Sequence, residues 1–563
     1  MTIRRSRISY CCLSGLAFLL VFARAQVNST APPPVSAESS GSFDGPAELP
    51  RLHVPTSLAS TPAAGKSRRV NSSADLQSAL DAAQCGDTVE LQAGAIFRGN
   101  FKLPAKSCDD SHWIVLRSSA PDASLPAEGT RVTPCYAGIA SLHGLPLHCT
   151  SAENVMAQIV GQPPILADAG ANHYRLIGLE ITQIPGKLAY SIVNLSDSSD
   201  HIIVDRCWVH GTAADDSQVG IRFNSRFLAV VDSFVSDIHF NGADSQAVGG
   251  AAGTGPYAII NNYLEAAGEN IMFGGAGATS TPSDIEIRRN HIYKPLAWRP
   301  DDPSFAGIKF TVKDLFEIKN AQRVLVEGNI LENMWSTAVV ITPKNQNGKC
   351  PICTAADITW RYNIVRHAGN GLTVFNAPSD SGAIAQPAQR ISVHDSLFVD
   401  IDGDKWHGDG RLFVVGTCPQ CQVVQDVSIR HNTATEGPRN FLWVHNPAKR
   451  PISHFVFADN IVPHGKYGVA GCEQTVSAIL DRCFASLVFT KNLIVGDTGR
   501  QSYPSGQLYA SDWRGVKLAS TEGQAGPYRL AENSKYRKSA SDGKDVGADM
   551  DLLERATAGV AQW

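Results

Sequence analysis

The sequence predicts an all-β fold, a single parallel β-helix solenoid of about eleven coils. A short phrase recurs eleven times: an apolar residue, two variable residues, a fixed position that is usually Asn, and an apolar residue two places later. Successive fixed positions stand from 26 residues (Cys207 to Ser233) to 39 residues (Asn290 to Asn329) apart. No unit has the helical segment of a leucine-rich or ankyrin repeat, so each unit fits one coil, stacked about 4.8 Å from the next. The fixed positions are Leu179, Cys207, Ser233, Asn262, Asn290, Asn329, Asn363, Ser396, Asn432, Asn460 and Asn492.

The Asn at the fixed position has a physical explanation. At a bend between strands, Asn tolerates a left-handed backbone, and its side-chain amide can hydrogen-bond neighbouring turns. Seven of the eleven fixed positions are Asn, so stacked coils would form a ladder of amides. The general rule for crossovers between parallel strands makes the helix right-handed. The repeated phrase is therefore structural rather than catalytic.

The first 25 residues predict a secretory signal peptide. Three arginines between residues 4 and 7 precede an apolar run over residues 13–22, and Ala23-Arg24-Ala25 forms a small-x-small cleavage site. The run is too short for a membrane span, and no later stretch predicts one. Cleavage removes four Arg and changes the formal charge from -4 to -8, which disfavours a nucleic-acid partner. We expect a soluble protein that is secreted, periplasmic or held at the cell surface.

Three further segments follow the signal peptide. Residues 26–66 are rich in Pro, Ser and Ala and predict a linker with little to bury. Residues 67–497 hold the solenoid, which starts with a short helix carrying Leu76 and Leu80 on one face. We expect this helix to cap the open N-terminal end of the first coil. After Asn492 the chain turns polar, and residues 498–563 predict a C-terminal cap or tail.

The cysteines favour an oxidising compartment. Two of the 13 lie in the signal peptide, and Cys207 occupies a stacking position, where we expect a buried free thiol. The two Cys-Pro-x-Cys motifs, which begin at Cys350 and Cys418, could instead share one zinc ion, although both loops would have to bend toward each other. The other ten form neighbouring couples that predict five local disulfides: Cys85/Cys108, Cys135/Cys149, Cys350/Cys353, Cys418/Cys421 and Cys472/Cys483.

The export signal, the capping helix and the Asn-marked coils resemble the right-handed parallel β-helix proteins of the pectate-lyase-like superfamily, over about residues 70–497. This superfamily includes polysaccharide lyases, glycoside hydrolases, epimerases, viral tailspikes and adhesins, so the fold does not fix the chemistry. A polygalacturonase-like hydrolase would need clustered carboxylates beside Gly-His-Gly and Arg-x-Lys motifs. The sequence offers Asp215-Asp216 and, far away, His407-Gly408-Asp409-Gly410, which does not match.

A lyase would remove the proton alpha to a uronate carboxylate, with a Lys, Arg, His or Tyr base and a cation such as Ca²⁺ to neutralise the carboxylate. Residues 262–271 are similar to the stretch before the active site of alginate-lyase and chondroitinase-B-like enzymes, which carry Gly-Glu-x-Glu-Ile and then Lys-Ser. Glu269 matches the first acidic residue, and the resemblance implies that it binds the metal. Ile271 stands in place of the second Glu, and residues 274–276 contain no Lys, so the base would have to come from elsewhere.

The longest coil, between Asn290 and Asn329, is the candidate site. It inserts about ten extra residues relative to the shortest coils, and insertions on solenoids usually build the binding face. Alternation over residues 307–313, continued by residues 316–319, predicts strands that carry charged side chains on one face. The alternative is a solvated strand face with Trp298 folded onto the coil. The candidate bases are Lys309, Lys313 and Lys319, and the candidate substrate-binding residues are Trp298, Arg299, Glu317 and Arg323.

Three function classes fit this sequence. The first is an extracellular polysaccharide lyase acting on an acidic, uronate-containing glycan; its signature would be Lys313, Lys319 and Glu269 around one groove. The second is a polysaccharide-binding or adhesive β-helix without catalysis, favoured by the departures from the lyase motif. The third, a tailspike-like protein, is disfavoured by the export signal and by the lack of coiled-coil heptads. We expect a monomer whose partner is a polysaccharide, with Ca²⁺ as the one candidate cofactor.

Overall fold

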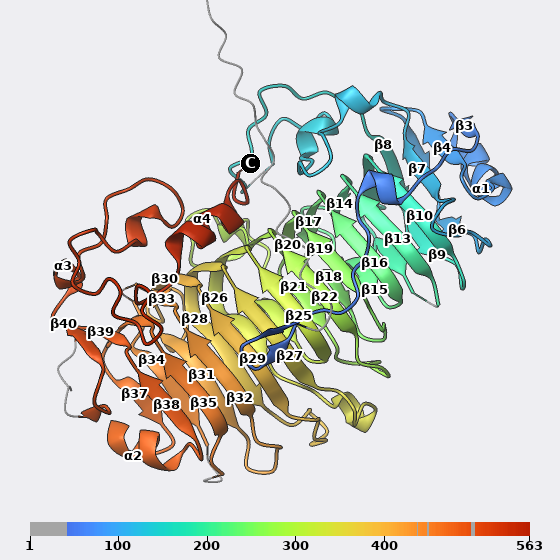
Figure 1. Ribbon diagram of the computed structural model, residues 1–563. Helices are drawn as coiled ribbons and strands as arrows, with labels where there is room; N and C mark the ends of the chain where they lie inside the picture. Colours follow the sequence, from blue (N-terminus) through green and yellow to red (C-terminus); the bar gives the residue numbers. More distant parts are fainter. Residues whose placement is uncertain are drawn as a thin grey trace, which may run out of the picture. The chain divides into compact units, whose positions relative to one another are not determined.

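The computed structural model describes residues 42–562, except residues 143, 197, 436, 447–449 and 497–501. These residues belong to one compact unit, Glu38–Trp563. Within it the chain forms a parallel β-helix (Figure 1), which confirms the predicted all-β class. The predicted signal peptide and residues 26–41 of the predicted linker lie outside the described residues.

Two large parallel sheets build the body of this unit. In each sheet, strands of one coil pair in parallel with strands of the next. The fourteen-stranded sheet contains β3 (Ser67–Val70), β4 (Thr88–Leu91), β7 (Ile114–Ser118), β10 (Asn172–Ile177), β13 (Asp200–Asp205), β16 (Arg226–Val231), β19 (Tyr257–Ile260), β22 (Ser283–Arg288), β25 (Ala321–Glu327), β27 (Ala355–Arg361), β29 (Ala388–His394), β32 (Gln425–Arg430), β35 (Ser453–Ala458) and β38 (Leu487–Thr490).

The second sheet has 24 strands and bends around the rest of each coil. It contains β5 (Ile96–Arg98), β6 (Phe101–Leu103), β8 (Ala157–Gly161), β9 (Ile165–Ala167), β11 (Leu179–Gln183), β12 (Val193–Leu195), β14 (Trp208–His210), β15 (Val219–Phe223), β17 (Phe234–Ile238), β18 (Gln246–Gly250), β20 (Tyr263–Ala266), β21 (Glu269–Phe273), β23 (His291–Tyr293), β24 (Asp314–Ile318), β26 (Ile330–Ile341), β28 (Ile364–Asn376), β30 (Leu397–Ile401), β31 (Arg411–Thr417), β33 (Thr433–Ala434), β34 (Asn440–His445), β36 (Ile461–Pro463), β37 (Gly468–Gly471), β39 (Leu493–Val495) and β40 (Leu508–Ala510).

The helices of the described chain are short, and none of them is long and apolar enough to cross a membrane. In α1 the buried Leu76 and Leu80 join the main core beside β3, β5 and β6. The helices are α1 (Ser73–Ala82), α2 (Val476–Arg482), α3 (Trp513–Val516) and α4 (Met550–Thr557), with single turns η1 (Leu58–Ser60), η2 (Asp122–Ser124), η3 (Pro134–Tyr136), η4 (Leu296–Trp298), η5 (Gln346–Gly348) and η7 (Gly526–Tyr528).

The repeated phrase produces the core and a buried amide ladder. The apolar residues three places before and two places after every fixed position lie in one continuous core, including the fully buried Trp360. Along the ladder, the backbone N–H and the side-chain amide of Asn290 both donate to Asn329 Oδ1, at 2.9 and 3.0 Å. Asn329 donates in the same way to Asn363. The ladder gives these buried backbone N–H groups the partner that burial requires.

The left-handed backbone of each bend lies one residue earlier than we expected. The fixed Asn does not carry it; the residue before it does, as at Asn261 (φ 57°) and Arg289 (φ 57°). The same holds at all eleven bends: the preceding residue makes the turn, and where the fixed residue is Asn its side chain is left to form the ladder hydrogen bonds. The other left-handed residues are Gly178, Arg206, Asp232, Gly328, Tyr362, Asp395, His431, Asp459 and Lys491.

Residues 42–66, which belong to the predicted linker, pack along the outside of the fourteen-stranded sheet (Figure 1). They contain a small hairpin of β1 (Phe43–Asp44) and β2 (Ala47–Glu48). The backbone N–H of Glu48 donates to Asp357 Oδ1 (3.2 Å), and that of Arg51 donates to Asp284 Oδ1 (2.9 Å). Packing against the solenoid therefore begins earlier in the chain than the sequence predicts.

The C-terminal segment folds back along the coils. Strand β40 pairs with β39, and the chain then returns through α3, η7 and α4 (Figure 1). Leu553 of α4 is fully buried in a cluster with Ile330, Ile364 and Leu397. The segment therefore covers apolar side chains of β26, β28 and β30 that would otherwise face water.

The structure pairs the ten expected cysteines in five disulfides: Cys85–Cys108, Cys135–Cys149, Cys350–Cys353, Cys418–Cys421 and Cys472–Cys483. Each Cys-Pro-x-Cys motif forms a disulfide between its own two cysteines, so none of these four sulfurs is free to bind a shared zinc ion. Cys207 is a buried free thiol, and burial raises its pKa to about 12.

Candidate functional site

Three neighbouring strands of the 24-stranded sheet bring the predicted lysines to two buried glutamates. In their parallel register, Glu269 at the start of β21 stands between Gln246 of β18 and Asp314 of β24. Lys313 directly precedes β24, and Lys319 directly follows it. Both ends of one short strand therefore present an ammonium group to the preceding coil.

The lysines converge on Glu269. Lys313 Nζ lies 2.7 Å from Glu269 Oε1 and 3.0 Å from Asp244 Oδ2. Lys319 Nζ lies 2.9 Å from Glu317 Oε2 and 3.5 Å from Glu269 Oε1. We call Lys313, Lys319, Glu269, Glu317 and Asp314 the lysine–carboxylate cluster. Its glutamates are buried, whereas the Lys313 side chain is 33% exposed, so solvent reaches the cluster through Lys313.

The charges in the cluster stabilise one another. Burial alone would raise the pKa of Glu269, but the charges of Lys319 and Lys313 lower it to about 2. Burial would lower the pKa of each lysine, but Glu269 and Glu317 raise both pKa values above the ordinary lysine value. Both lysines are therefore ammonium ions at neutral pH, and Glu269 is a carboxylate.

Asp314 completes a set of three carboxylates with Glu269 and Glu317, whose oxygens lie within 4.8 Å of one another. Asp314 Oδ1 is buried and accepts no hydrogen bond from any residue that the structure describes. Burial, followed by the charges of Glu317 and Glu269, raises the pKa of Asp314 well above its ordinary value. An all-oxygen donor set with an unsatisfied buried carboxylate fits a hard divalent cation such as Ca²⁺.

Lys294, from the same long coil, has a structural role. Its ammonium group is fully buried and donates to Ala266 O (2.7 Å), Gly268 O (2.8 Å) and Asn270 Oδ1 (2.8 Å). Burial lowers its pKa to about 7. Because all three donors are used within the coil, Lys294 braces the turn before β21.

Four predicted site residues lie outside the cluster. Trp298 is buried in edge contact with His239 and Phe310, so it packs onto the coil as the alternative interpretation holds. Arg323 pairs with Asp284 (2.7 Å) on the fourteen-stranded sheet. These residues fill ordinary structural roles that their sequence positions did not reveal.

Arg299 and Lys309 also point elsewhere. The Arg299 guanidinium pairs with Asp301 (2.8 Å) and lies over the Trp406 ring, 5.0 Å from its centroid. Lys309 is exposed, and none of the cluster contacts above involves it. The structure has no strand over residues 307–313, and β24 begins only at Asp314. Phe310 turns inward and its ring stacks on His239.

Sequence reasoning missed Asp314, Gln246 and Asp244. Asp314 directly follows Lys313, a signal that could have been noticed. Gln246 Nε2 donates to Glu269 Oε2 (2.7 Å), and Asp244 reaches Lys313 from the same earlier coil. Only the register between coils of unequal length reveals these last two contacts.

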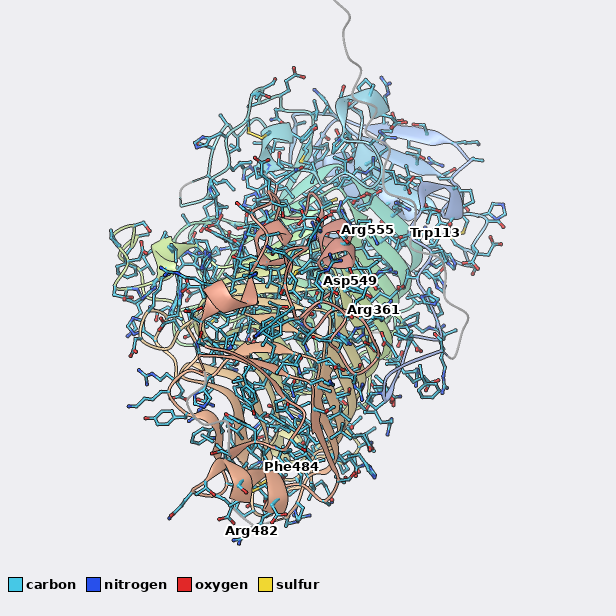
Figure 2. The ribbon with its side chains drawn as sticks, turned by 60° about the vertical axis from the view of Figure 1, so that its left-hand side comes forward. Trp113, Arg361, Arg482, Phe484, Asp549 and Arg555 are labelled. Atoms are coloured by element: carbon cyan, nitrogen blue, oxygen red, sulfur yellow. A yellow bond between two sulfur atoms is a disulfide. The ribbon has the colours of Figure 1, made fainter. Side chains whose placement is uncertain are left out.

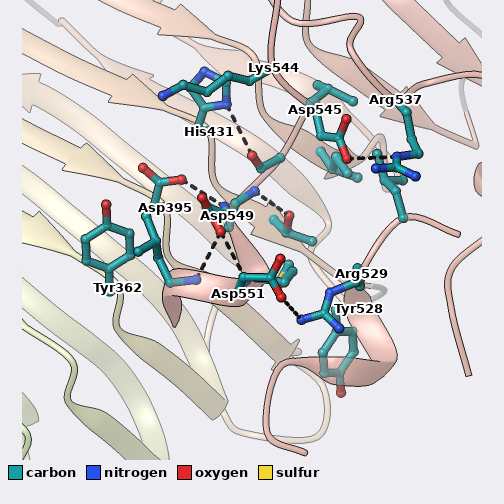
Figure 3. A pocket seen from close by; sticks show the side chains of 18 of the residues that line it. Tyr362, Asp395, His431, Tyr528, Arg529, Arg537, Lys544, Asp545, Asp549 and Asp551 are labelled. Carbon is teal, nitrogen blue, oxygen red and sulfur yellow. Dashed lines mark hydrogen bonds and ion pairs between the residues drawn. The ribbon is translucent and has the colours of Figure 1, made fainter. Parts of the chain in front are cut away.

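Two cavities lie elsewhere in the unit. One of about 390 Å³ lies between the C-terminal segment and the coils, lined by residues that include Tyr362, His431, Tyr528 and Asp549 (Figure 3). The other, of about 610 Å³, lies beside the N-terminal hairpin and includes Asp44. Their described linings contain no residue of the lysine–carboxylate cluster.

No protein-family model matches this sequence, and no curated protein matches it. Among solved structures, the chain is similar to the PL6 family alginate lyase AlyGC at 11% identity, covering 86% of this chain and 58% of that one, with a TM-score of 0.45. It is similar to an alginate lyase from Paenibacillus sp. str. FPU-7 at 14% identity, covering 79% and 98%, with a TM-score of 0.32. It is also similar to an α-1,3-glucanase from Streptomyces thermodiastaticus at 13% identity, covering 78% and 67%, with a TM-score of 0.45. Identities this low say nothing about activity.

Proposed function

We propose that this chain is an exported polysaccharide lyase that cleaves an acidic, uronate-containing glycan by β-elimination at the lysine–carboxylate cluster. One observation carries the proposal: Lys313 and Lys319, which flank β24, meet at the same buried glutamate, Glu269. These are the three residues that we named for the signature of a lyase, and their convergence supports the proposal. Two cations fixed at one partly exposed point suit a substrate with a carboxylate on each sugar ring.

The chemistry divides between the two lysines. One ammonium group neutralises the uronate carboxylate, which makes the adjacent C–H bond acidic enough to break. The other lysine, as a neutral amine, takes the proton; the carbanion electrons form the ring double bond, and the glycosidic oxygen leaves with its bonding pair. Lys313 is the more exposed and suits carboxylate binding, which gives Lys319 the role of base.

Glu269, Asp314 and Glu317 would hold a Ca²⁺ ion, if one takes part. When bound, the ion would neutralise the uronate carboxylate by direct coordination. With or without the ion, Gln246 Nε2 donates a 2.7 Å hydrogen bond that keeps the Glu269 carboxylate oriented.

Export is part of the proposal. Five disulfides suit an oxidising compartment, and residues 1–25 have the pattern of a signal peptide. We assign the mature chain to the cell exterior or periplasm, as a monomer of about eleven repeat-bearing coils in which α1 closes the N-terminal end.

A polysaccharide-binding protein without catalysis is the second candidate. It is favoured by the raised pKa values of Lys313 and Lys319, because paired ammonium groups bind carboxylates but cannot accept a proton. The two functions share a site and differ in whether a lysine ever becomes a neutral amine there.

The test is incubation of the mature protein with alginate, pectate or chondroitin sulfate, with and without Ca²⁺, while the ultraviolet absorbance of an unsaturated uronate product is followed. A lyase gives a rise that Lys319→Ala and Lys313→Ala abolish and that Lys309→Ala, an exposed control outside the cluster, leaves intact. If no substrate gives a rise but the polysaccharide still binds, the protein is a binding module. If neither lysine matters for cleavage or binding, the cluster is not the site.

A further inference from the structure

Two histidines and an aspartate meet on the fourteen-stranded sheet, on the first coils and independently of the proposed lyase site. His173 lies in β10, His201 lies in β13, and Asp110 lies in the loop before β7. His173 Nε2 is 3.2 Å from Asp110 Oδ1, and His201 Nε2 is 3.9 Å from the same oxygen. Trp113, which is labelled in Figure 2, makes T-shaped contacts with both imidazoles, 5.1 and 6.2 Å between centroids.

Both histidines belong to a column of left-handed residues that crosses the sheet, one per coil. His173, His201 and Phe227 have φ values of 57°, 51° and 50°. Their rings stack, with centroids 4.5 Å apart between the histidines and 4.3 Å apart between His201 and Phe227. Further along, the column pairs opposite charges: Asp284 with Arg323, Asp357 with Arg390, and Asp426 with His454. The stacked histidines break this alternation, since like residues face each other there.

Hydrogen bonds fix which nitrogen of each ring carries the proton. His173 Nδ1 lies 2.8 Å from Asn172 Oδ1, and His201 Nδ1 lies 2.9 Å from Asp200 Oδ1. Both oxygens are acceptors, so each Nδ1 donates, and each neutral ring keeps its lone pair on Nε2. Among the residues that the structure describes, the two Nε2 atoms and the Asp110 carboxylate then form three acceptors that face one another without a donor. Such a cluster needs a cation to hold it together.

We propose that Asp110, His173 and His201 bind a divalent transition-metal ion of the zinc class, with water completing the coordination. Imidazole nitrogen and carboxylate oxygen are ligands that such ions favour. Oxygen acceptors on Nδ1 are what orient histidine ligands in metal sites, and Asp200 is itself anchored by Arg226 at 2.8 Å. The Asp110 side chain is 83% exposed, which gives the ion and its water access from solvent.

The three ligand atoms lie within 4.8 Å of one another, and the two separations from Asp110 suit this ion after a small closure. Ligand atoms about 2.0–2.2 Å from a tetrahedral metal lie roughly 3.4 Å apart. The His173–Asp110 separation of 3.2 Å is close to this value. The His201–Asp110 separation of 3.9 Å has to shorten by about half an ångström, which the exposed Asp110 loop can supply. The rings themselves are held by Trp113 and Phe227.

The experiment titrates the metal-free full chain with Zn²⁺ by calorimetry and with Co²⁺ by visible absorption, which reports nitrogen coordination. We expect one Zn²⁺ per chain, bound at least about tenfold more weakly by Asp110→Asn and by His201→Gln. Asp110 is on the surface, so its variant folds, and circular dichroism checks His201→Gln. Asp109→Asn and His454→Gln are matched controls, because they alter the neighbouring acid and another histidine of the same column.

Glu269→Gln separates this site from the lysine–carboxylate cluster, and Zn²⁺ binding should survive that change. The proposal is overturned if the wild type takes up no Zn²⁺, or if Asp110→Asn and His201→Gln bind it as the wild type does.

Discussion

Lys313 Nζ lies 2.7 Å from Glu269 Oε1, although 44 residues separate the two in the chain. The contact exists because β21 and β24 are neighbours in the sheet, with the whole inserted segment of the long coil looped out between them. Asp244 adds a second carboxylate at 3.0 Å from the same nitrogen. A lysine held between two carboxylates keeps its proton, and this determines how the cluster should respond to pH.

Glu317→Gln should move the alkaline rise of kcat/KM to lower pH. Only the neutral amine accepts a proton, so activity should increase as pH rises toward the raised pKa of Lys319, the proposed base. Glu317 Oε2 lies 2.9 Å from Lys319 Nζ, and removing its charge weakens the stabilisation of the ammonium form, so the amine appears at lower pH. The measurement is the pH profile of product formation, with Asp302→Asn as a control in the same coil. An unchanged profile would show that proton loss from Lys319 does not limit the rate.

Asn329→Ala should destabilise the fold through the amide ladder. Asn329 Oδ1 accepts from the buried N–H of Asn290, and its Nδ2 donates to Ile287 O at 2.9 Å. Alanine leaves both backbone groups without a partner inside the core, at a cost of about 2–6 kcal/mol for the two groups. Chemical denaturation measures the change, and Asn241→Ala, at an exposed position, is the control. If Asn329→Ala lowers the free energy of unfolding no more than the control does, water must replace the lost hydrogen bonds of the ladder.

The fold could be predicted because its repeat is encoded locally. The apolar pair occurs around every fixed position, and Asn stands at seven of the eleven, so the core and the ladder follow from the sequence. The exact bend residue did not follow, since Arg289, Tyr362 and Lys491 are not residues that signal a left-handed backbone. The docking of residues 42–66 was also hidden, because a Pro-rich composition resembles a linker even when a few residues such as Val54 are buried.

The candidate site could be predicted only in part. Lys313, Glu317 and Lys319 lie within seven residues of one another, so a single short strand is enough to bring their side chains together. Their contact with Glu269 depends on the register between coils, which the long insertion obscures. Both interpretations of Trp298 stayed open, because a buried tryptophan and a sugar-binding tryptophan look alike in a loop of mixed polarity; in the structure its side chain is buried.

Leu553→Ala and Leu552→Ala should differ sharply, although the residues are adjacent in α4. Leu553 is fully buried against the coils, whereas Leu552 is 37% exposed. We expect Leu553→Ala to cost about 2–5 kcal/mol by leaving a cavity beside Ile364. Leu552→Ala should change the free energy of unfolding by no more than about 0.5 kcal/mol. Thermal or urea unfolding of both variants makes the comparison, and equal effects would contradict the folded-back position of α4.

Docking of the N-terminal hairpin should weaken as the pH rises. His394 joins Asp395 (2.8 Å) to Asp44 of the hairpin (3.0 Å), and Arg361 also pairs with Asp44 (2.8 Å). Burial lowers the pKa of His394, but the two aspartates raise it to about 9, above the ordinary value of 6.5. Because the folded pKa is the higher one, the stabilisation is complete below pH 6.5 and is lost as the pH rises through about 9.

Hydrogen exchange of the backbone around Asp44 and Glu48, corrected for intrinsic rates, should therefore become faster between these two pH values. In His394→Asn this exchange should be fast already at low pH and should not change across the same range. His454→Asn removes a histidine that pairs with Asp426 on the same sheet and should behave like the wild type. The pair of Arg361 with Asp44 does not titrate in this range, so the hairpin should loosen rather than detach. Exchange that does not change with pH in the wild type would show that the pair of His394 with Asp44 does not contribute to the docking.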